Sequence, residues 1–184
     1  MLNRMPQKSV TSRFASRSFI VMFHVVLYQP EIAPNTGNII RLCANSGATL
    51  HLIRPLGFTL DERRLRRAGL DYHEWTTVRE HDSLEEFTCA VRPRRLFALS
   101  TRATRCYSDE RFRKGDGFLF GPETRGLPQS VLDSLPQERR LRIPMRPGNR
   151  SLNLSNAVAV VCYEAWRQNA FRVDVSAKDI ELCA

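Results

Sequence analysis

Long apolar segments and patterned cysteines are both missing from this sequence. No apolar run approaches the roughly 20 residues that a membrane-spanning helix needs, so we expect no membrane partner. The five cysteines form no C-x-x-C pair and have no zinc-type spacing to the four histidines. Unpatterned cysteines in odd number are typical of a reducing compartment, which predicts a cytoplasmic protein without a metal site. Cys43 and Cys162 fall within apolar helical patterns and are predicted core residues.

Common nucleotide-binding and hydrolase motifs are also missing. The chain has no G-x-x-x-x-G-K-[ST] loop and no G-x-S-x-G turn. Gly115, Gly117 and Gly121 do not form a G-x-G-x-x-G fingerprint, because the third glycine comes one position late and a strand lies between the glycines. The sequence therefore gives no support to a P-loop, a dinucleotide site of the Rossmann type or a serine hydrolase.

Acidic residues are scarce relative to basic ones. The formal net charge is +9 and the isoelectric point is about 9.9, which favours a polyanionic partner, nucleic acid first. Residues 1–21 contain four basic residues and no acid, so the remainder carries +5, from 9 minus 4. We predict a disordered basic extension over residues 1–21, one domain over 22–170 and a tail over 171–184.

Strand and helix patterns alternate along the domain. Apolar runs predict strands over 23–28, 49–53, 95–100, 117–121 and 140–143, with a weaker one over 74–78. Helices are predicted from Asn35 as N-cap to Gly47, over 60–70, from a Ser83 capping box to 91, and over 128–135. This alternation predicts an α/β fold with a mostly parallel sheet and helices on both faces.

A polar loop followed by an apolar helix occupies residues 143–166. Leu154, Val158, Val161 and Ala165 lie on one helical face, and the N-cap is expected at Ser151, Asn153 or Ser155. Free backbone N–H groups at such a helix start suit an anionic or strongly hydrogen-bonding ligand. An ordinary strand-loop-helix connection with a good cap is the alternative interpretation.

Three loops rich in glycine, asparagine and proline follow predicted strands. Because the carboxyl ends of parallel strands share one edge, these loops are expected to form a pocket there. Their motifs are Asn35-x-Gly37-x-x-x-Arg41, Gly121-x-Glu123-x-x-Gly126, and Ile143-Pro144 continuing to Ser151-Leu152-Asn153. In this order and spacing the three motifs resemble those of the SPOUT (SpoU-type) RNA 2′-O-ribose methyltransferases, over about residues 23–169.

Two further stretches resemble one subgroup of that family. Residues 66–73 and 163–167 are similar to the small bacterial tRNA (cytidine/uridine)-2′-O-methyltransferases that act at wobble position 34. The resemblance implies a homodimer, a deep C-terminal trefoil knot and methylation of C or U in the anticodon stem-loop of tRNA, with leucine isoacceptors as substrates. A ribosomal-RNA 2′-O-methyltransferase of the same family and a non-catalytic RNA-binding module are the alternatives.

The same resemblance implies S-adenosyl-L-methionine as cofactor. The positions that carry over are Leu99, Gly121, Ile143, Ser151, Leu152 and Asn153. Backbone groups at these positions would bind the adenine and methionine parts, with apolar walls around the ring.

Catalysis is assigned to Arg41, Glu123 and Asn153 on the same grounds. Arg41 is expected to orient the ribose hydroxyl and stabilise its developing charge, since an arginine stays protonated and is a poor base. A surface ion pair is the alternative role for Arg41. Glu123 either orders the second loop or contacts the ribose, and the sequence leaves this open.

Basic and aromatic residues outside the motifs are candidate RNA contacts. We expect arginines to contact the backbone and Tyr72 with His73 to stack on an unpaired base. A solvated basic face, and packing of Tyr72, are the alternatives. The predicted RNA-binding residues are Arg41, Arg63, Arg66, Arg67, Tyr72, His73, Arg102 and Arg105.

Overall fold

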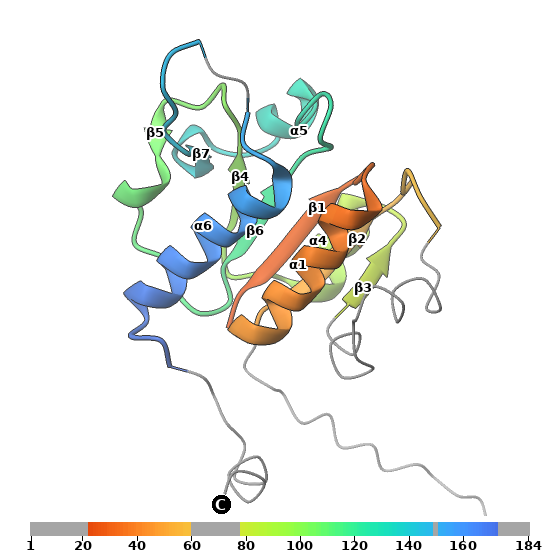
Figure 1. Ribbon diagram of the computed structural model, residues 1–184, viewed down its shortest axis with the longest axis horizontal. Helices are drawn as coiled ribbons and strands as arrows, with labels where there is room; N and C mark the ends of the chain where they lie inside the picture. Colours follow the sequence, from red (N-terminus) through yellow and green to blue (C-terminus); the bar gives the residue numbers. More distant parts are fainter. Residues whose placement is uncertain (1–21, 60–77, 149–150, 173–184) are drawn as a thin grey trace, which may run out of the picture.

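A computed structural model describes residues 22–59, 78–148 and 151–172, which form one α/β layer structure (Figure 1). The sheet of these residues has the strand order β3-β2-β1-β6-β4-β7-β5, and every neighbouring pair is parallel. The strands are β1 His24–Tyr28, β2 Thr49–Ile53, β3 Val78–His81, β4 Leu96–Leu99, β5 Arg105–Cys106, β6 Gly117–Phe120 and β7 Arg140–Arg142. The helical segments are α1 Ala33–Ser46, α4 Leu84–Val91, η1 Tyr107–Asp109, α5 Gln129–Asp133, η2 Gln137–Arg139 and α6 Leu154–Gln168.

Helices cover both faces of the sheet, as the alternating pattern predicted. On one face α1 and α6 pack against the sheet and each other, and Ile39, Ile40, Val158 and Val161 are fully buried there. On the opposite face α4 and α5 contribute Phe87 and Leu132 to a second core. Because strands β1 and β6 lie between two apolar layers, their sequences read as continuous apolar runs.

Most predicted elements are confirmed within a residue or two. Strand β2 has the predicted bounds, and β1, β4, β6 and β7 are slightly shorter than predicted. The Ser83 capping box is present: Ser83 Oγ accepts from the Glu86 backbone N–H at 3.1 Å. Asn153 is the N-cap of α6, since its Oδ1 accepts from the Ser155 N–H at 2.9 Å. Cys43 and Cys162 are buried core residues, as expected.

The predicted start of the first helix is wrong. Helix α1 begins at Ala33, with Ile32 as N-cap and no side-chain cap. Pro34 in the first turn needs no N–H partner and fits this earlier start. Asn35 lies inside the helix, so its amide is available for a different set of contacts.

Three other expectations need correction. Strand β3 begins at Val78 and runs to His81, instead of ending at 78, because its register follows pairing with Leu50–Ile53. The two-residue strand β5 lies in a segment predicted as irregular. Helix α5 ends at Asp133 because Pro136 follows closely. The predicted helix over 60–70 lies outside the described residues.

Three histidines form a buried chain across β1, β2 and β3. His24 Nδ1 lies 3.0 Å from His51 Nε2, and His51 Nδ1 lies 2.9 Å from His81 Nε2. The Phe87 ring of α4 packs against all three imidazoles. Burial lowers the pKa of His24 to about 4 and that of His51 to about 2, and it also lowers the pKa of His81.

None of the helices in the described ranges is both long and apolar enough to cross a membrane.

Candidate functional site

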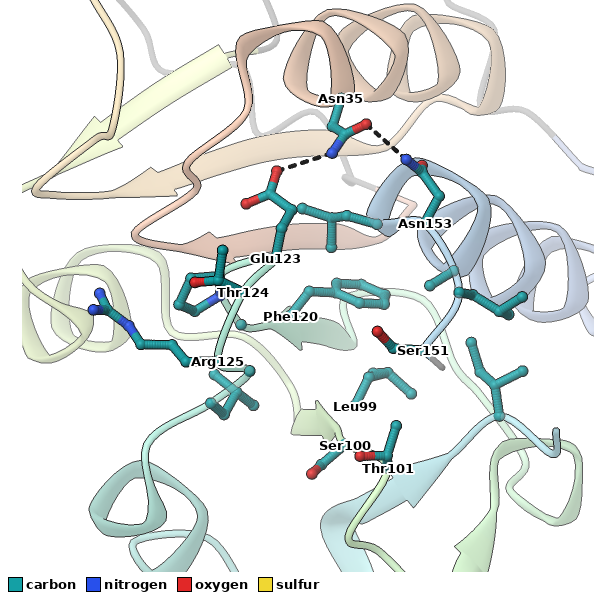
Figure 2. A pocket seen from close by; sticks show the side chains of 18 of the residues that line it. Asn35, Leu99, Ser100, Thr101, Phe120, Glu123, Thr124, Arg125, Ser151 and Asn153 are labelled. Carbon is teal, nitrogen blue, oxygen red and sulfur yellow. Dashed lines mark hydrogen bonds between the residues drawn. The ribbon is translucent and has the colours of Figure 1, made fainter. Parts of the chain in front are cut away.

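A cavity of about 720 Å³ lies at the carboxyl edge of β4 and β6, where the three motif loops meet (Figure 2). Its size is in the range of cofactor sites. Asn35 of the first motif lines it, together with residues from the loop after β6 and from the approach to α6. The predicted convergence of three loops on one pocket is therefore present in the fold.

Apolar side chains and close backbone approach shape the inner wall. Leu99, Phe120 and Ile143 line the cavity together with Leu127 and Leu152. At Gly121 a Cβ atom would lie 2.2 Å from the Leu127 backbone nitrogen, so only glycine fits between β6 and the loop that follows. This wall can hold a flat, apolar ring while the surrounding backbone supplies polar groups.

A chain of three polar side chains ties the motifs together. The Asn35 Nδ2 group donates to Glu123 Oε1 at 3.0 Å, and Asn153 Nδ2 donates to Asn35 Oδ1 at 2.9 Å (Figure 2). These bonds span 88 and 118 residues of sequence. We call Asn35, Glu123 and Asn153 the amide chain. It fixes the start of α1, the loop after β6 and the start of α6 relative to one another.

Glu123 anchors the loop before α1 as well. Its carboxylate accepts from the Glu31 N–H at 2.8 Å and the Ile32 N–H at 3.2 Å, besides the Asn35 amide. The Glu31 carboxylate in turn accepts from the Thr124 N–H and hydroxyl, at 3.1 and 2.7 Å. These bonds from Thr124 hold the pKa of Glu31 below its usual value. The two loops therefore interlock through reciprocal bonds between side chain and backbone.

Most residues predicted for the site line this cavity. All six predicted cofactor positions do, from Leu99 to Asn153, and so do Glu123 and Arg102. Arg41 is exposed on α1 and is not among the lining residues of the described chain. Arg105 lies in a structural ion pair with Glu110 at 2.8 Å. The predicted RNA contacts Arg63, Arg66, Arg67, Tyr72 and His73 lie outside the described residues.

Several lining residues had no assigned role from the sequence. Asn35 was interpreted as a helix cap, whereas its amide links the other two motifs. Thr124 and Arg125 belong to the second motif loop, and Phe120 at the end of β6 also lines the cavity. The position of Phe120 at the end of an apolar strand was the signal that could have indicated it. Within the described residues, no group of histidine, cysteine and acidic side chains is arranged to hold a metal ion.

Comparison with known proteins agrees with this geometry. The model of the SpoU rRNA Methylase family matches residues 22–163. A tRNA (cytidine(34)-2′-O)-methyltransferase from Escherichia coli strain K12 is 61% identical over 147 residues, covering 80% of this chain and 94% of that protein.

Solved structures have the same fold. A structure described by the 2-OH methylation of C/U34 on tRNA is 51% identical, with a TM-score of 0.74, and 82% of this chain and 98% of that chain are covered. The methyltransferase AviRb from Streptomyces viridochromogenes, in complex with AdoMet, has a TM-score of 0.70 over 82% of this chain and 58% of its own. At 24% identity, AviRb shows the fold alone. The chain therefore belongs to the SpoU rRNA Methylase family.

Proposed function

We propose that this protein transfers a methyl group from S-adenosyl-L-methionine to the ribose 2′-hydroxyl of nucleotide 34, C or U, in tRNA. The observation that carries this proposal is the 61% identity to a tRNA (cytidine(34)-2′-O)-methyltransferase across 94% of that relative. Because 23–24% identical neighbours share the fold without sharing this identity, fold alone would not select the substrate. Leucine isoacceptors and the anticodon stem-loop are our proposed substrate and contact region.

The cavity fits S-adenosyl-L-methionine in its chemistry. Leu99, Phe120 and Ile143 offer apolar surface for an adenine ring, and Gly121 lets backbone groups approach closely. Ser151, Leu152 and Asn153 line the same cavity next to the start of α6. When bound there, the cofactor would supply an electrophilic sulfonium methyl.

The residues of this chain must align a ribose hydroxyl with that methyl. The amide chain holds the three motif loops in one geometry, so alignment is built before the RNA arrives. Asn153 has both amide groups in hydrogen bonds, and its side chain is therefore fixed at the cavity edge. We propose that Arg41 stabilises the developing oxyanion and a neighbouring phosphate as a protonated guanidinium.

A homodimer is the assembly that we propose. Exposed aromatic residues lie on α6 and just after its end: Tyr163 in the helix is 45% exposed and Phe171 beyond it is 52% exposed. Trp166 packs its ring against both of them, at 5.6 and 5.4 Å between centroids. A cluster of exposed aromatic rings is characteristic of protein interfaces. Light scattering should give twice the 21.2 kDa chain mass, and a single monomeric species at micromolar concentration would reject the dimer.

We propose two further properties with the function. One is a deep trefoil knot formed by the segments from β6 to α6, consistent with the family membership and with the packing of α6 against α1. The other is a cytoplasmic location, which fits the free thiols of Cys43, Cys89, Cys106 and Cys162.

The test uses synthetic anticodon stem-loops of a leucine tRNA. The purified protein with S-adenosyl-L-methionine should methylate the natural RNA, as measured by mass spectrometry of its nucleosides. A stem-loop with 2′-deoxyribose at position 34 should accept no methyl group, whereas one with 2′-deoxyribose at a neighbouring position should still react. Methylation of the 34-deoxy RNA would show that another atom is the acceptor.

A further inference from the structure

Two arginines at the cavity, Arg102 and Arg125, differ in their hydrogen-bond partners from five arginines that form ion pairs. The guanidinium groups of Arg54, Arg95, Arg105, Arg140 and Arg167 each lie between 2.6 and 3.1 Å from a carboxylate oxygen. Arg102 and Arg125 instead each bond a glutamine amide oxygen, at 3.1 Å in both cases. Within the described residues, neither of these two has a carboxylate at ion-pair distance.

The glutamines orient the two guanidinium groups without neutralising them. Gln129 donates its Nε2 to Asp133 at 2.9 Å, which leaves its oxygen facing Arg102. Gln29 has a backbone φ of 50°, a left-handed conformation that costs energy outside glycine, and its side chain holds Arg125. Each guanidinium uses one of its five N–H groups on a glutamine and keeps the others for a ligand.

Both arginines line the same cavity and come from two neighbouring loops. Arg102 follows β4 and Arg125 follows β6, and these strands are neighbours in the sheet. The charged residues that line the cavity are Arg102, Arg125 and Glu123, and the Glu123 carboxylate already accepts three N–H bonds. The Glu31 carboxylate accepts from the Thr124 N–H and hydroxyl and also interacts electrostatically with Arg125, although no carboxylate oxygen in the described residues lies at ion-pair distance from that guanidinium. Two basic residues and one acidic residue therefore line the cavity, and the lining itself has a net charge of +1.

Figure 2 separates Arg125 from the part of the cavity suited to the cofactor. Its guanidinium points outward, away from Phe120 and Ser151. An outward-facing, oriented guanidinium with no carboxylate at ion-pair distance in the described residues is suited to an anion that approaches from solvent. Resting on the proposed function, we propose that Arg102 and Arg125 together form a clamp for the RNA phosphates that flank the ribose to be methylated.

The clamp predicts a change in salt dependence. Each phosphate contact on single-stranded nucleic acid contributes about 0.7 to the slope of log affinity against log salt concentration. Arg102→Gln with Arg125→Gln should make this slope shallower by roughly 1.4, measured by anisotropy of a labelled anticodon stem-loop between about 50 and about 200 mM salt. Arg102→Lys with Arg125→Lys should restore most of the slope, because a point charge still binds phosphate.

A matched control removes the same charge from the opposite edge of the sheet. Arg92 and Arg94 are exposed and precede the amino end of β4, so Arg92→Gln with Arg94→Gln should leave the slope unchanged. An equal loss of slope in this control would show a general charge effect and overturn the clamp. An unchanged slope in the Arg102 and Arg125 variant would overturn it as well.

Calorimetry of S-adenosyl-L-methionine binding tests whether the two arginines bind the carboxylate of the cofactor instead of RNA phosphates. Cofactor affinity should be the same in the wild type and in the glutamine variant. A fall in cofactor affinity with an unchanged salt slope would assign the arginines to the cofactor carboxylate and overturn the clamp. Failure of the proposed function would be seen separately, as wild-type protein that binds the stem-loop but transfers no methyl group to ribose 34.

Discussion

Hydrogen bonds link three polar side chains in series at two places in this molecule, and the two series join different parts of the fold. The amide chain of Asn35, Glu123 and Asn153 joins three loops at the cavity edge. The histidine chain of His24, His51 and His81 joins three neighbouring strands beneath α4, with exposed fractions of 8%, 0% and 7%. The amide chain borders the cavity and the histidine chain is enclosed by the core.

The chemistry of each chain fits its location. The amide chain consists of two asparagines, whose amides do not titrate, and the Glu123 carboxylate, which accepts from three N–H donors at the cavity edge. The buried imidazoles stay neutral because burial opposes their charged form. We infer that the amide chain controls catalysis and the histidine chain controls stability. The following predictions separate these two roles.

The largest effect is expected from acid acting on the histidine chain. The native pKa values of His24 and His51, about 4 and about 2, lie below the unfolded value of 6.5, so the unfolded state binds more protons between these limits. The contribution of the two neutral histidines to the free energy of unfolding is therefore complete above about pH 7, and it is lost as the pH falls through 6.5. At pH 5 each of these two histidines should lower the free energy of unfolding by about 2 kcal/mol, and the two together should lower it by about 4 kcal/mol. Denaturant unfolding at pH 7.5 and pH 5 measures this.

A single substitution identifies the origin of that loss. His24→Asn keeps a polar group beside His51 but removes one titrating site. The free energy of unfolding should therefore differ by about 2 kcal/mol less between pH 7.5 and pH 5 than it does in the wild type. Arg79 lowers the pKa of all three histidines and Glu86 raises that of His81, and both remain in this variant. Methyl transfer at pH 7.5 should match that of the wild type. An unchanged pH dependence would assign the acid sensitivity to other groups.

Neither the amide chain nor the histidine chain could be predicted from the sequence. Strands β1, β2 and β6 were predictable because apolar runs between two helical layers are a local signal. The histidines are 27 and 30 residues apart, and only the parallel register brings them together. Strand β3 was misplaced because its two middle residues, Arg79 and Glu80, are exposed at the sheet edge and leave no apolar pattern.

The sequence predicted several of the residues that line the candidate site, but it did not predict the hydrogen bonds that link them. The motifs named Glu123 and Asn153 as site residues, and both line the cavity. That Asn35 bridges them required the earlier start of α1, which a Pro34 in the first turn permits. Arg125 carried no signal distinguishing it from other arginines, since its glutamine partner lies 96 residues away.

The next largest effect is expected from Arg41, which belongs to neither chain. It lies more than two turns past the first residue of α1 and is exposed. If it stabilises the developing oxyanion, Arg41→Ala should reduce methyl transfer by roughly 10²-fold or more. Single-turnover transfer to the stem-loop measures this, with cofactor affinity unchanged by calorimetry.

A conservative variant sharpens the assignment of Arg41. Arg41→Lys should recover only part of the rate, because a point charge does not reproduce the planar fork that binds hydroxyl and phosphate together. Near wild-type turnover of Arg41→Ala would establish a surface role for this side chain.

A smaller effect is expected from breaking the amide chain at its acidic end. Glu123→Gln keeps the shape but replaces an oxygen acceptor by an NH₂ group that faces N–H donors from Glu31, Ile32 or Asn35. Losing one hydrogen bond to a charged group costs about 1.5 kcal/mol, so methyl transfer should fall by roughly 10-fold. The unfolding midpoint of this variant should keep the wild-type pH dependence, since the histidine chain is intact. A steeper or shallower pH dependence would contradict the separation of the two chains.

The smallest effect is expected from removing residues 1–21. Met22 belongs to the packed domain, since it is 4% exposed and its carbonyl accepts from the Gly115 N–H at 3.0 Å. Neither chain involves an earlier residue, and the segment has no apolar periodicity. A protein starting at Met22 should therefore unfold at the same denaturant midpoint and bind S-adenosyl-L-methionine with the same affinity. Its affinity for the stem-loop is free to fall, because four positive charges are lost and each phosphate contact depends on charge. A lower unfolding midpoint or weaker cofactor binding would instead show that the extension packs against the domain.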